Sequence, residues 1–212
     1  MGTTLNKFVR RYTTMSSALQ TLKQSKIVLL SPSKWDDSND AYFMKLYREK
    51  SSSKSVLALC CTMASETYHH WRVFSAGIEG VCIEFKREPL EEAVRRTRGF
   101  RAGPVQYLKV KDLGARGPDD YERIPFIKRD GYSDEKEWRV IAETNTITEF
   151  MDFDIEIDWI SGITFNPWIP PSLADNLRTV IREVCPGIKA PLRSSSLTSS
   201  RQWKEAGKRL FG

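Results

Sequence analysis

The sequence of 212 residues lacks the short motifs that mark several large enzyme classes. It contains no G-x-G-x-x-G turn, no G-x-x-x-x-G-K-[ST] phosphate loop, no H-E-x-x-H pair and no G-x-S-x-G elbow. These motifs supply the dinucleotide turn, the phosphate cradle, the zinc ligands and the exposed serine of their classes. Rossmann-type dehydrogenases, phosphate-loop ATPases, zincins and α/β-hydrolases therefore all lose support.

Histidine and cysteine are scarce, which bears on metal binding. The two histidines, His69 and His70, are adjacent, and without cysteine partners in place they cannot build a structural zinc site. We therefore predict no metal, and we expect both histidines at exposed helix positions more readily than at a substrate. Three of the four cysteines lie in apolar runs, so we expect reduced, buried thiols, as in a cytosolic protein. The cysteines are Cys60, Cys61, Cys82 and Cys185.

No apolar run reaches the length of a membrane span, and residues 1–7 lack the apolar core of a signal peptide. We therefore expect a cytoplasmic protein with no membrane contact. Hydrophobic residues make up 40% of the chain and charged residues 28%, an ordinary globular composition. The formal net charge of +6 makes an anionic partner plausible, whether a nucleic acid, a dinucleotide or an acidic protein.

Strand patterns outnumber helix patterns, and the two types are mixed without regular βαβ alternation. The sequence therefore predicts an α+β fold with a bent or split mixed sheet and peripheral helices. Strands are expected at 7–13, 26–30, 56–63, 81–85, 105–110, 135–143, 148–157 and 160–165. Helices are expected at 14–24, 43–47, 68–75, 89–98, 119–129 and 172–184, with a basic amphipathic tail near the C-terminus.

The stretch from Ser133 to Glu143 alternates between apolar and charged residues, as a strand with two different faces does. One face carries Trp138, Val140 and Ala142, and the other carries Glu135, Glu137, Arg139 and Ile141. Two acids on one face repel each other unless a cation, a sugar hydroxyl or solvent compensates them. Spacing alone favours an edge strand with a solvated charged face. A catalytic pair of carboxylates is the alternative.

A basic stretch offers a candidate nucleic-acid surface. Arg95, Arg96, Arg98 and Arg101, with Phe100 and Tyr107 close by, resemble a single-strand track of cations and stacking rings. A solvated face is the ordinary interpretation of such a run, and the overall positive charge favours nucleic acid over it.

Several stretches resemble, in chain order, the motifs of one large bacterial family long described as a domain of unknown function. Arg11-Tyr12-Thr13, residues 26–32 and Asn39-Asp40 follow the pattern HYTS…L…IL…LWLSSP…ND. Residues 71–85 resemble MWxxYAxxxKGVCIEF, and residues 135–141 resemble YEKEWRLI. The resemblance spans about residues 8–195. The chain departs from it at Arg11, where histidine is usual, and at Phe74, where tyrosine is usual.

That family in turn resembles the ADP-ribosyltransferase fold, especially its toxins that modify DNA or RNA. The resemblance implies that NAD is the substrate, with Glu137 as the catalytic carboxylate and Glu135 assisting it. The residues expected to contact NAD are Arg11, Tyr12, Thr13, Asn39 and Trp71. A place in the core is the simpler expectation for Trp71, and a helix cap is an equal alternative for Asn39. Arg139 is expected to form salt bridges with the two glutamates.

These observations predict an ADP-ribosyltransferase-like domain over residues 1–195 and a basic amphipathic tail over 196–212. The expected function is an NAD-dependent ADP-ribosyltransferase toxin that modifies a nucleic acid, RNA before DNA, in defence against phages with an antitoxin protein. Three alternatives stay open. The chain could be a non-catalytic module that binds nucleic acid or protein, a transferase that acts on protein, or a hydrolase that only consumes NAD.

Overall fold

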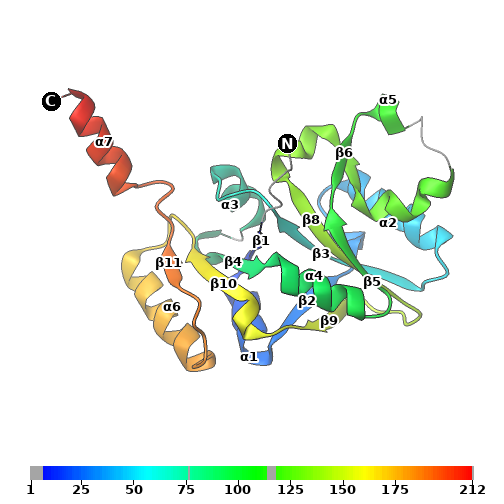
Figure 1. The fold of residues 1–212 in the computed structure, drawn as a ribbon, viewed down its shortest axis with the longest axis horizontal. Helices are drawn as coiled ribbons and strands as arrows, with labels where there is room; N and C mark the ends of the chain where they lie inside the picture. Colours follow the sequence, from blue (N-terminus) through cyan, green and yellow to red (C-terminus); the bar gives the residue numbers. More distant parts are fainter. Residues whose placement is uncertain (1–6, 76, 114–117, 212) are drawn as a thin grey trace. The chain divides into compact units, whose positions relative to one another are not determined.

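The structure, a computed structural model, describes residues 7–75, 77–113 and 118–211 (Figure 1). The described residues form two compact units that are interleaved along the chain. Unit 1 comprises residues 7–9, 26–64, 86–113 and 118–155, and unit 2 comprises residues 10–25, 65–75, 77–85 and 156–211. The single domain over residues 1–195 and the separate tail stay predictions.

Unit 1 is built on an antiparallel sheet with the strand order β5-β8-β3-β2-β9. Its strands are β2 (Lys26–Leu30), β3 (Ser55–Thr62), β5 (Phe100–Pro104), β8 (Glu137–Thr144) and β9 (Phe150–Asp154). β8 pairs with β3 along its whole length and with β5 on its other side. The first six residues of β8 are buried, so the prediction of an edge strand with a solvated charged face, which spacing alone favoured, is wrong.

Helical turns and a small parallel ladder complete unit 1. The helical elements are η1 (Pro32–Lys34), α2 (Ser38–Lys50), α4 (Arg87–Arg96), α5 (Val110–Leu113), η3 (Pro118–Phe126) and η4 (Asp130–Glu135). β6 (Gln106–Leu108) pairs in parallel with β7 (Ile127–Arg129). Asp37 caps α2, because its Oδ1 accepts the backbone N–H of Asn39 at 3.0 Å.

The two faces of β8 bury different partners, as the alternation predicts. Trp138 has no exposed surface, and its indole N–H donates to Oε1 of Glu91 on α4 at 3.1 Å. On the opposite face Ile141 packs in a cluster with Met44 and Tyr47 of α2. Burying one such large apolar side chain contributes about 1.5–3 kcal/mol, so these contacts fix α2 and α4 to the strand.

Unit 2 contains most of β1 and the strands β4, β10 and β11, in the order β1-β4-β10-β11. The bounds are β1 (Phe8–Thr14), β4 (Gly80–Lys86), β10 (Ile160–Phe165) and β11 (Leu192–Ser194). Its helical elements are α1 (Met15–Gln24), α3 (Tyr68–Phe74), η2 (Gly77–Glu79), η5 (Ile157–Trp159), α6 (Pro171–Val184) and α7 (Arg201–Phe211). α7 lies within the segment predicted as a tail, and Trp203 and Leu210 on it are each 80% exposed.

The observed elements confirm the α+β class and correct several details. β5 was not predicted, and the predicted helix over 119–129 is instead the 3-10 helix η3 followed by β7. Pro125 lies inside that segment and has no N–H for an α-helical ladder. His70 is buried and not at an exposed position, and Cys60 is exposed whereas the other three cysteines are buried. Within the described ranges, no helix has the length and apolar character to cross a membrane.

Candidate active site

Glu135 and Glu137 lie close together, but not on one strand as predicted. Glu135 ends η4, Lys136 turns the chain with a left-handed φ of 44°, and Glu137 begins β8. Both carboxylates nevertheless reach the same ammonium group. Nζ of Lys128 lies 2.7 Å from Oε2 of Glu135 and 3.4 Å from Oε2 of Glu137. The turn at Lys136 therefore brings the two acids together around one cation.

Arg139 is the second cation of the site, and it is fully buried. Its Nε and Nη2 donate to the two carboxylate oxygens of Glu137 at 2.7 and 2.8 Å. Nη1 donates to Oδ1 of Asp40 at 3.0 Å and to the carbonyl of Pro125 at 2.9 Å, and Nη2 also donates to Oδ2 of Asp40. All five N–H groups of the guanidinium are thus used. This forked geometry fixes the orientation of the Glu137 carboxylate.

Asp40, Lys128, Glu135, Glu137 and Arg139 together form what we name the charge cluster. Each is buried or nearly so, and Nζ of Lys128 also lies 3.7 Å from Oδ2 of Asp40. The cluster sets three carboxyl groups against two cations. The predicted pairing of Arg139 with Glu137 is confirmed. The carboxylate of Glu135 forms its 2.7 Å ion pair with Lys128.

The environments of the carboxyl groups move their pKa values in different directions. Burial alone would raise the pKa of Glu137, but the charge and hydrogen bonds of Arg139, with help from Lys128, lower it. Burial raises the pKa of Glu135 despite the hydrogen bond from Lys128. Burial likewise raises the pKa of Asp40 despite its contacts with Arg139. The cluster therefore keeps Glu137 ionised and makes Glu135 the stronger base of the pair.

The backbone around Glu137 is fixed on both sides. Its N–H donates to Oη of Tyr107 at 2.7 Å, and its carbonyl accepts the N–H of Val105 at 2.9 Å. The hydroxyl of Thr62 donates to the carbonyl of Glu135 at 2.5 Å. Burial and the nearby charge of Glu137 raise the pKa of the Cys60 thiol on β3. The backbone hydrogen bonds and the neighbouring strands thus fix the position of the carboxylate.

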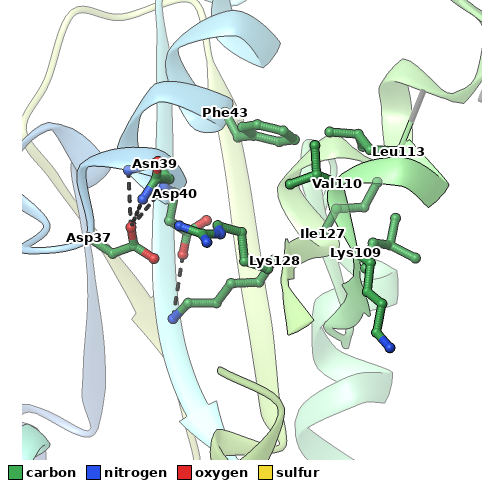
Figure 2. A pocket seen from close by; sticks show the side chains of 11 residues that line it. Asp37, Asn39, Asp40, Phe43, Lys109, Val110, Leu113, Ile127 and Lys128 are labelled. Carbon is green, nitrogen blue, oxygen red and sulfur yellow. Dashed lines mark hydrogen bonds and ion pairs between the residues drawn. The ribbon is translucent and has the colours of Figure 1, made fainter. Parts of the chain in front are cut away.

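A small pocket borders the charge cluster (Figure 2). Figure 2 shows Lys128 reaching toward Asp40 at one end, while Phe43, Val110 and Leu113 form an apolar wall at the other. The pocket measures about 40 Å³, little more than the share of liquid volume that one water occupies. It could hold a water molecule beside the cluster but not a dinucleotide.

Two of the residues expected to contact NAD pack within unit 2. Trp71 is 1% exposed, and its indole N–H donates to Oε1 of Glu66 at 2.6 Å. The ring of Tyr12 meets that of Trp71 edge-on at 4.9 Å and stacks on His70 at 5.5 Å. Trp71 therefore occupies a core position, which was the simpler expectation for it.

The other three expected NAD contacts lie at partly or fully exposed positions. Arg11 and Thr13 of β1 are half-buried and belong to unit 2, whereas Asn39 is exposed on α2 of unit 1. Asn39 does not cap its helix, since Asp37 does, and its side-chain amide donates to Oδ1 of Asp37 at 3.1 Å. Arg11 and Glu137 belong to different units, so their action on one NAD molecule stays a prediction.

The four basic residues expected to contact nucleic acid are divided by the sheet of unit 1. Arg95, Arg96 and Arg98 are exposed, in α4 or just after it. Arg101 pairs with Ile141 in the β5–β8 ladder and so faces away from Trp138 and α4. Its Nη2 lies 3.1 Å from Oε1 of Glu143, and its Nη1 donates to the backbone of Glu122.

Sequence reasoning missed three residues that shape the cluster. Asp40 enters the sequence analysis only as part of the Asn39-Asp40 motif, Lys128 lies inside a predicted helix, and Tyr107 is expected only as a stacking ring. The pairing of Arg139 with Asp40 spans 99 positions of the chain, and no local pattern signals it.

Comparisons with known proteins give three similar solved structures, all of DarT from Thermus sp. 2.9. The complex with ADP-ribosylated ssDNA is 7% identical with a TM-score of 0.47, covering 90% of this chain and 94% of that one. The complex with carba-NAD+ is 6% identical with a TM-score of 0.44, covering 91% and 97%. The complex with NAD+ is 7% identical with a TM-score of 0.46, covering 92% and 98%. No family model matches the chain, and no curated protein matches it. Likeness at this level does not define a family for this chain.

Proposed function

We propose that this chain is an NAD-dependent ADP-ribosyltransferase in which Glu137 is the catalytic carboxylate and Glu135 assists it. The observation that carries the proposal is that the charge cluster moves the pKa values of its two glutamates in opposite directions. Glu137 is buried yet held ionised, and a second carboxyl group beside it has a raised pKa. Titratable pairs whose environments move their pKa values apart are typical of acid–base and electrostatic roles in catalysis. The motif resemblance supplies the reaction class.

The role of Glu137 follows from the charge that the reaction develops. Nicotinamide leaves NAD as a neutral base, so no general acid is needed, and the ribose becomes positively charged. A fixed carboxylate that accepts a hydrogen bond from the ribose 2′-hydroxyl stabilises this positive charge more as the charge grows. An ionised carboxylate has about four acceptor sites, and Arg139 and Lys128 use three of them on Glu137. A ribose hydroxyl would use the remaining acceptor site.

Glu135 suits the proton that the acceptor group must lose. A base works best when its pKa lies nearer the working pH than that of an ordinary carboxylate. The raised pKa of Glu135 moves it in that direction. Lys128, which bonds to both glutamates, would hold the pair in place and limit their mutual repulsion.

The remaining parts of the proposal concern binding. The Arg11 guanidinium suits the NAD pyrophosphate or the adenosine ribose, because it donates in a fork. Tyr12, Thr13, Asn39 and Trp71 stay predicted contacts. We further propose that the target is a nucleic acid, RNA before DNA, on the grounds of the net charge of +6 and the exposed arginines near α4. The roles as a toxin and in phage defence with an antitoxin rest on the motif resemblance.

One observation favours a second candidate, a binding module without catalysis. Arg139 uses all five of its donors inside the protein, so the charge cluster could serve only to hold β7, β8 and α2 together. Arg11 in the place of the usual histidine points the same way. A transferase that acts on protein and an NAD hydrolase are the enzymatic alternatives.

Incubation with labelled NAD separates these candidates. The protein is mixed with total RNA, with DNA or with cell lysate, and both macromolecular label and free nicotinamide are measured. Label on nucleic acid supports the proposal, and label on protein supports the protein-directed transferase. Nicotinamide release without label indicates the hydrolase, and neither product indicates the binding module. Glu137→Gln should abolish the products, whereas Glu149→Gln, at an exposed glutamate of unit 1, should leave them unchanged.

A further inference from the structure

A groove of about 830 Å³ lies on unit 1, formed by Lys7 and the start of β1, by α4 with the residue before it, and by the end of β5. Its cationic side chains are Lys7, Lys86, Arg87 and Arg95. Phe8 and Pro104 add apolar walls. We name this site the α4 groove. Pockets of this size hold whole small ligands in other proteins, so the groove has room for several chemical groups in a row.

The groove is positive even after its own acids are counted. The two acids that line it are Glu88 and Glu91, against four cations. Glu91 is already engaged, since Oε1 accepts the Trp138 indole N–H at 3.1 Å and lies 3.3 Å from Nε of Arg87. Lys7, Lys86 and Arg95 are exposed and lie at the groove, where an anion with several charges can meet them together.

The combination of cations with a ring favours one kind of anion. Single-stranded nucleic acids bind in grooves whose lysines and arginines follow the phosphates while aromatic rings stack on bases. The α4 groove offers three exposed cations and the half-buried ring of Phe8. A small phosphate ligand would need only one or two of these cations, so their number and the size of the groove point to a polymer.

The groove also ends near the backbone of Glu137, whose carboxylate lies on the opposite face of β8 from Trp138 and α4. Pro104 pairs with Trp138 in the β5–β8 ladder, and the N–H of Val105 donates to the carbonyl of Glu137 at 2.9 Å. The end of the groove at Pro104 is therefore next to the end of β8 at which Glu137 begins the strand. A nucleic-acid strand held in the groove would be led to the end of β8 at which Glu137 lies.

We propose that the α4 groove binds the backbone of a single-stranded nucleic acid, with Lys7, Lys86 and Arg95 on its phosphates and Phe8 against a base. This inference rests on the proposed function for the nature of the substrate. The proposed surface differs from the sequence-based expectation in two ways. Lys7 and Lys86 line it together with Arg95. Arg101 does not belong to it, because its side chain faces the other side of the sheet.

The test measures binding without NAD, so that it does not depend on catalysis. Fluorescence anisotropy follows the full chain with short labelled single-stranded RNA and DNA oligonucleotides and a duplex of equal length, at several salt concentrations. The variant replaces Lys7, Lys86 and Arg95 by Gln together. The matched control replaces Arg48, Lys50 and Lys54 by Gln, three exposed cations of unit 1 away from the groove. Thermal unfolding verifies that both variants fold.

Each phosphate contact with a single strand adds about 0.7 to the slope of log affinity against log salt. Loss of three contacts should therefore lower that slope by about 2 and weaken binding at least tenfold at 0.1 M salt. The control should bind like the wild type. Phe8→Leu should weaken binding to the single strands with an unchanged salt slope.

Three outcomes would overturn the inference: equal losses in the variant and its control, stronger binding of the duplex than of single strands, or no binding by the wild type. Nicotinamide release from NAD, measured in parallel, distinguishes this failure from failure of the proposed function. A wild type that releases nicotinamide but binds no oligonucleotide would remove the groove and leave the enzyme. A wild type that binds oligonucleotides through the groove but releases no nicotinamide would support the groove and remove the enzymatic function.

Discussion

Replacing Arg139 by Gln should damage the fold more than almost any other single change, because Arg139 is the fully buried cation of the charge cluster. The substitution leaves Asp40 and Glu137 buried with the more distant ammonium of Lys128 as the remaining cation of the cluster. Breaking a buried ion pair from one side costs about 3–5 kcal/mol, since the remaining charge stays out of water and uncompensated. That is a large part of a stability of about 5–15 kcal/mol.

Equilibrium unfolding in urea at pH 7 measures this cost. Arg139→Lys serves as the comparison that keeps the charge and loses the fork, and it should be intermediate. Arg48→Gln, at an exposed arginine of α2, should change the free energy of unfolding by no more than about 0.5 kcal/mol. Adding Asp40→Asn to Arg139→Gln removes one stranded charge. The double variant should therefore be less destabilised than the sum of the single variants, by at least about 1 kcal/mol.

Acid gives an independent check on the same reasoning. Without Arg139, the pKa values of Asp40 and Glu137 should rise, because the cation that favours their charged forms is gone. The folded variant then takes up protons more readily than the wild type. Its deficit in stability should shrink as the pH falls from 7 toward 4. A deficit below about 1 kcal/mol at pH 7, or one that grows in acid, would refute the reasoning.

Three further predictions concern unit 1. The folded-state pKa of Glu137 is lowered, so the contribution of Glu137 to stability is complete above its ordinary pKa and lost as the pH falls through the folded value. Urea unfolding from pH 7 to 3 should therefore show the difference in unfolding free energy between wild type and Glu137→Gln becoming smaller. Gly99→Ala should lower the free energy of unfolding by about 1–3 kcal/mol in the same assay. Gly99 has φ +81°, and an added Cβ would lie 2.8 Å from the Glu143 carbonyl oxygen. The control Gly131→Ala should be tolerated, because an added Cβ there meets nothing within 4 Å. Arg101→Gln should lower the unfolding free energy by about 1–2 kcal/mol through loss of its contacts with Glu143.

Local pattern was enough to predict much of β8 and its burial. Alternation with a period of two places Trp138, Val140 and Ala142 on one face, and all three are fully buried. The same pattern could not show that Arg139 on the other face is buried too. That depends on Asp40 of α2 and Pro125 of η3, which bond the guanidinium on that face, and no local pattern around Arg139 indicates either partner.

The site was predictable only where its residues are close in sequence. The proximity of Glu135 and Glu137 was expected from their spacing, although Lys136 breaks the strand between them. The compensating groups come from α2 and β7, and nothing local distinguishes Asp40 or Lys128 from ordinary surface charges. Their partners are set by tertiary packing, which brings positions 40 and 139 into contact. The ionised state of the catalytic candidate is therefore a property of the fold and not of its motif.

The most direct test of the central claim compares nicotinamide release from NAD by wild type, Glu137→Gln and Glu149→Gln at equal folded concentration. The account predicts that the wild type and Glu149→Gln release nicotinamide at the same rate. Glu137→Gln should be slower by a factor of about a hundred or more, the usual loss when a positioned electrostatic group is removed. Equal rates for Glu137→Gln and wild type, or no release by any of the three, would contradict it.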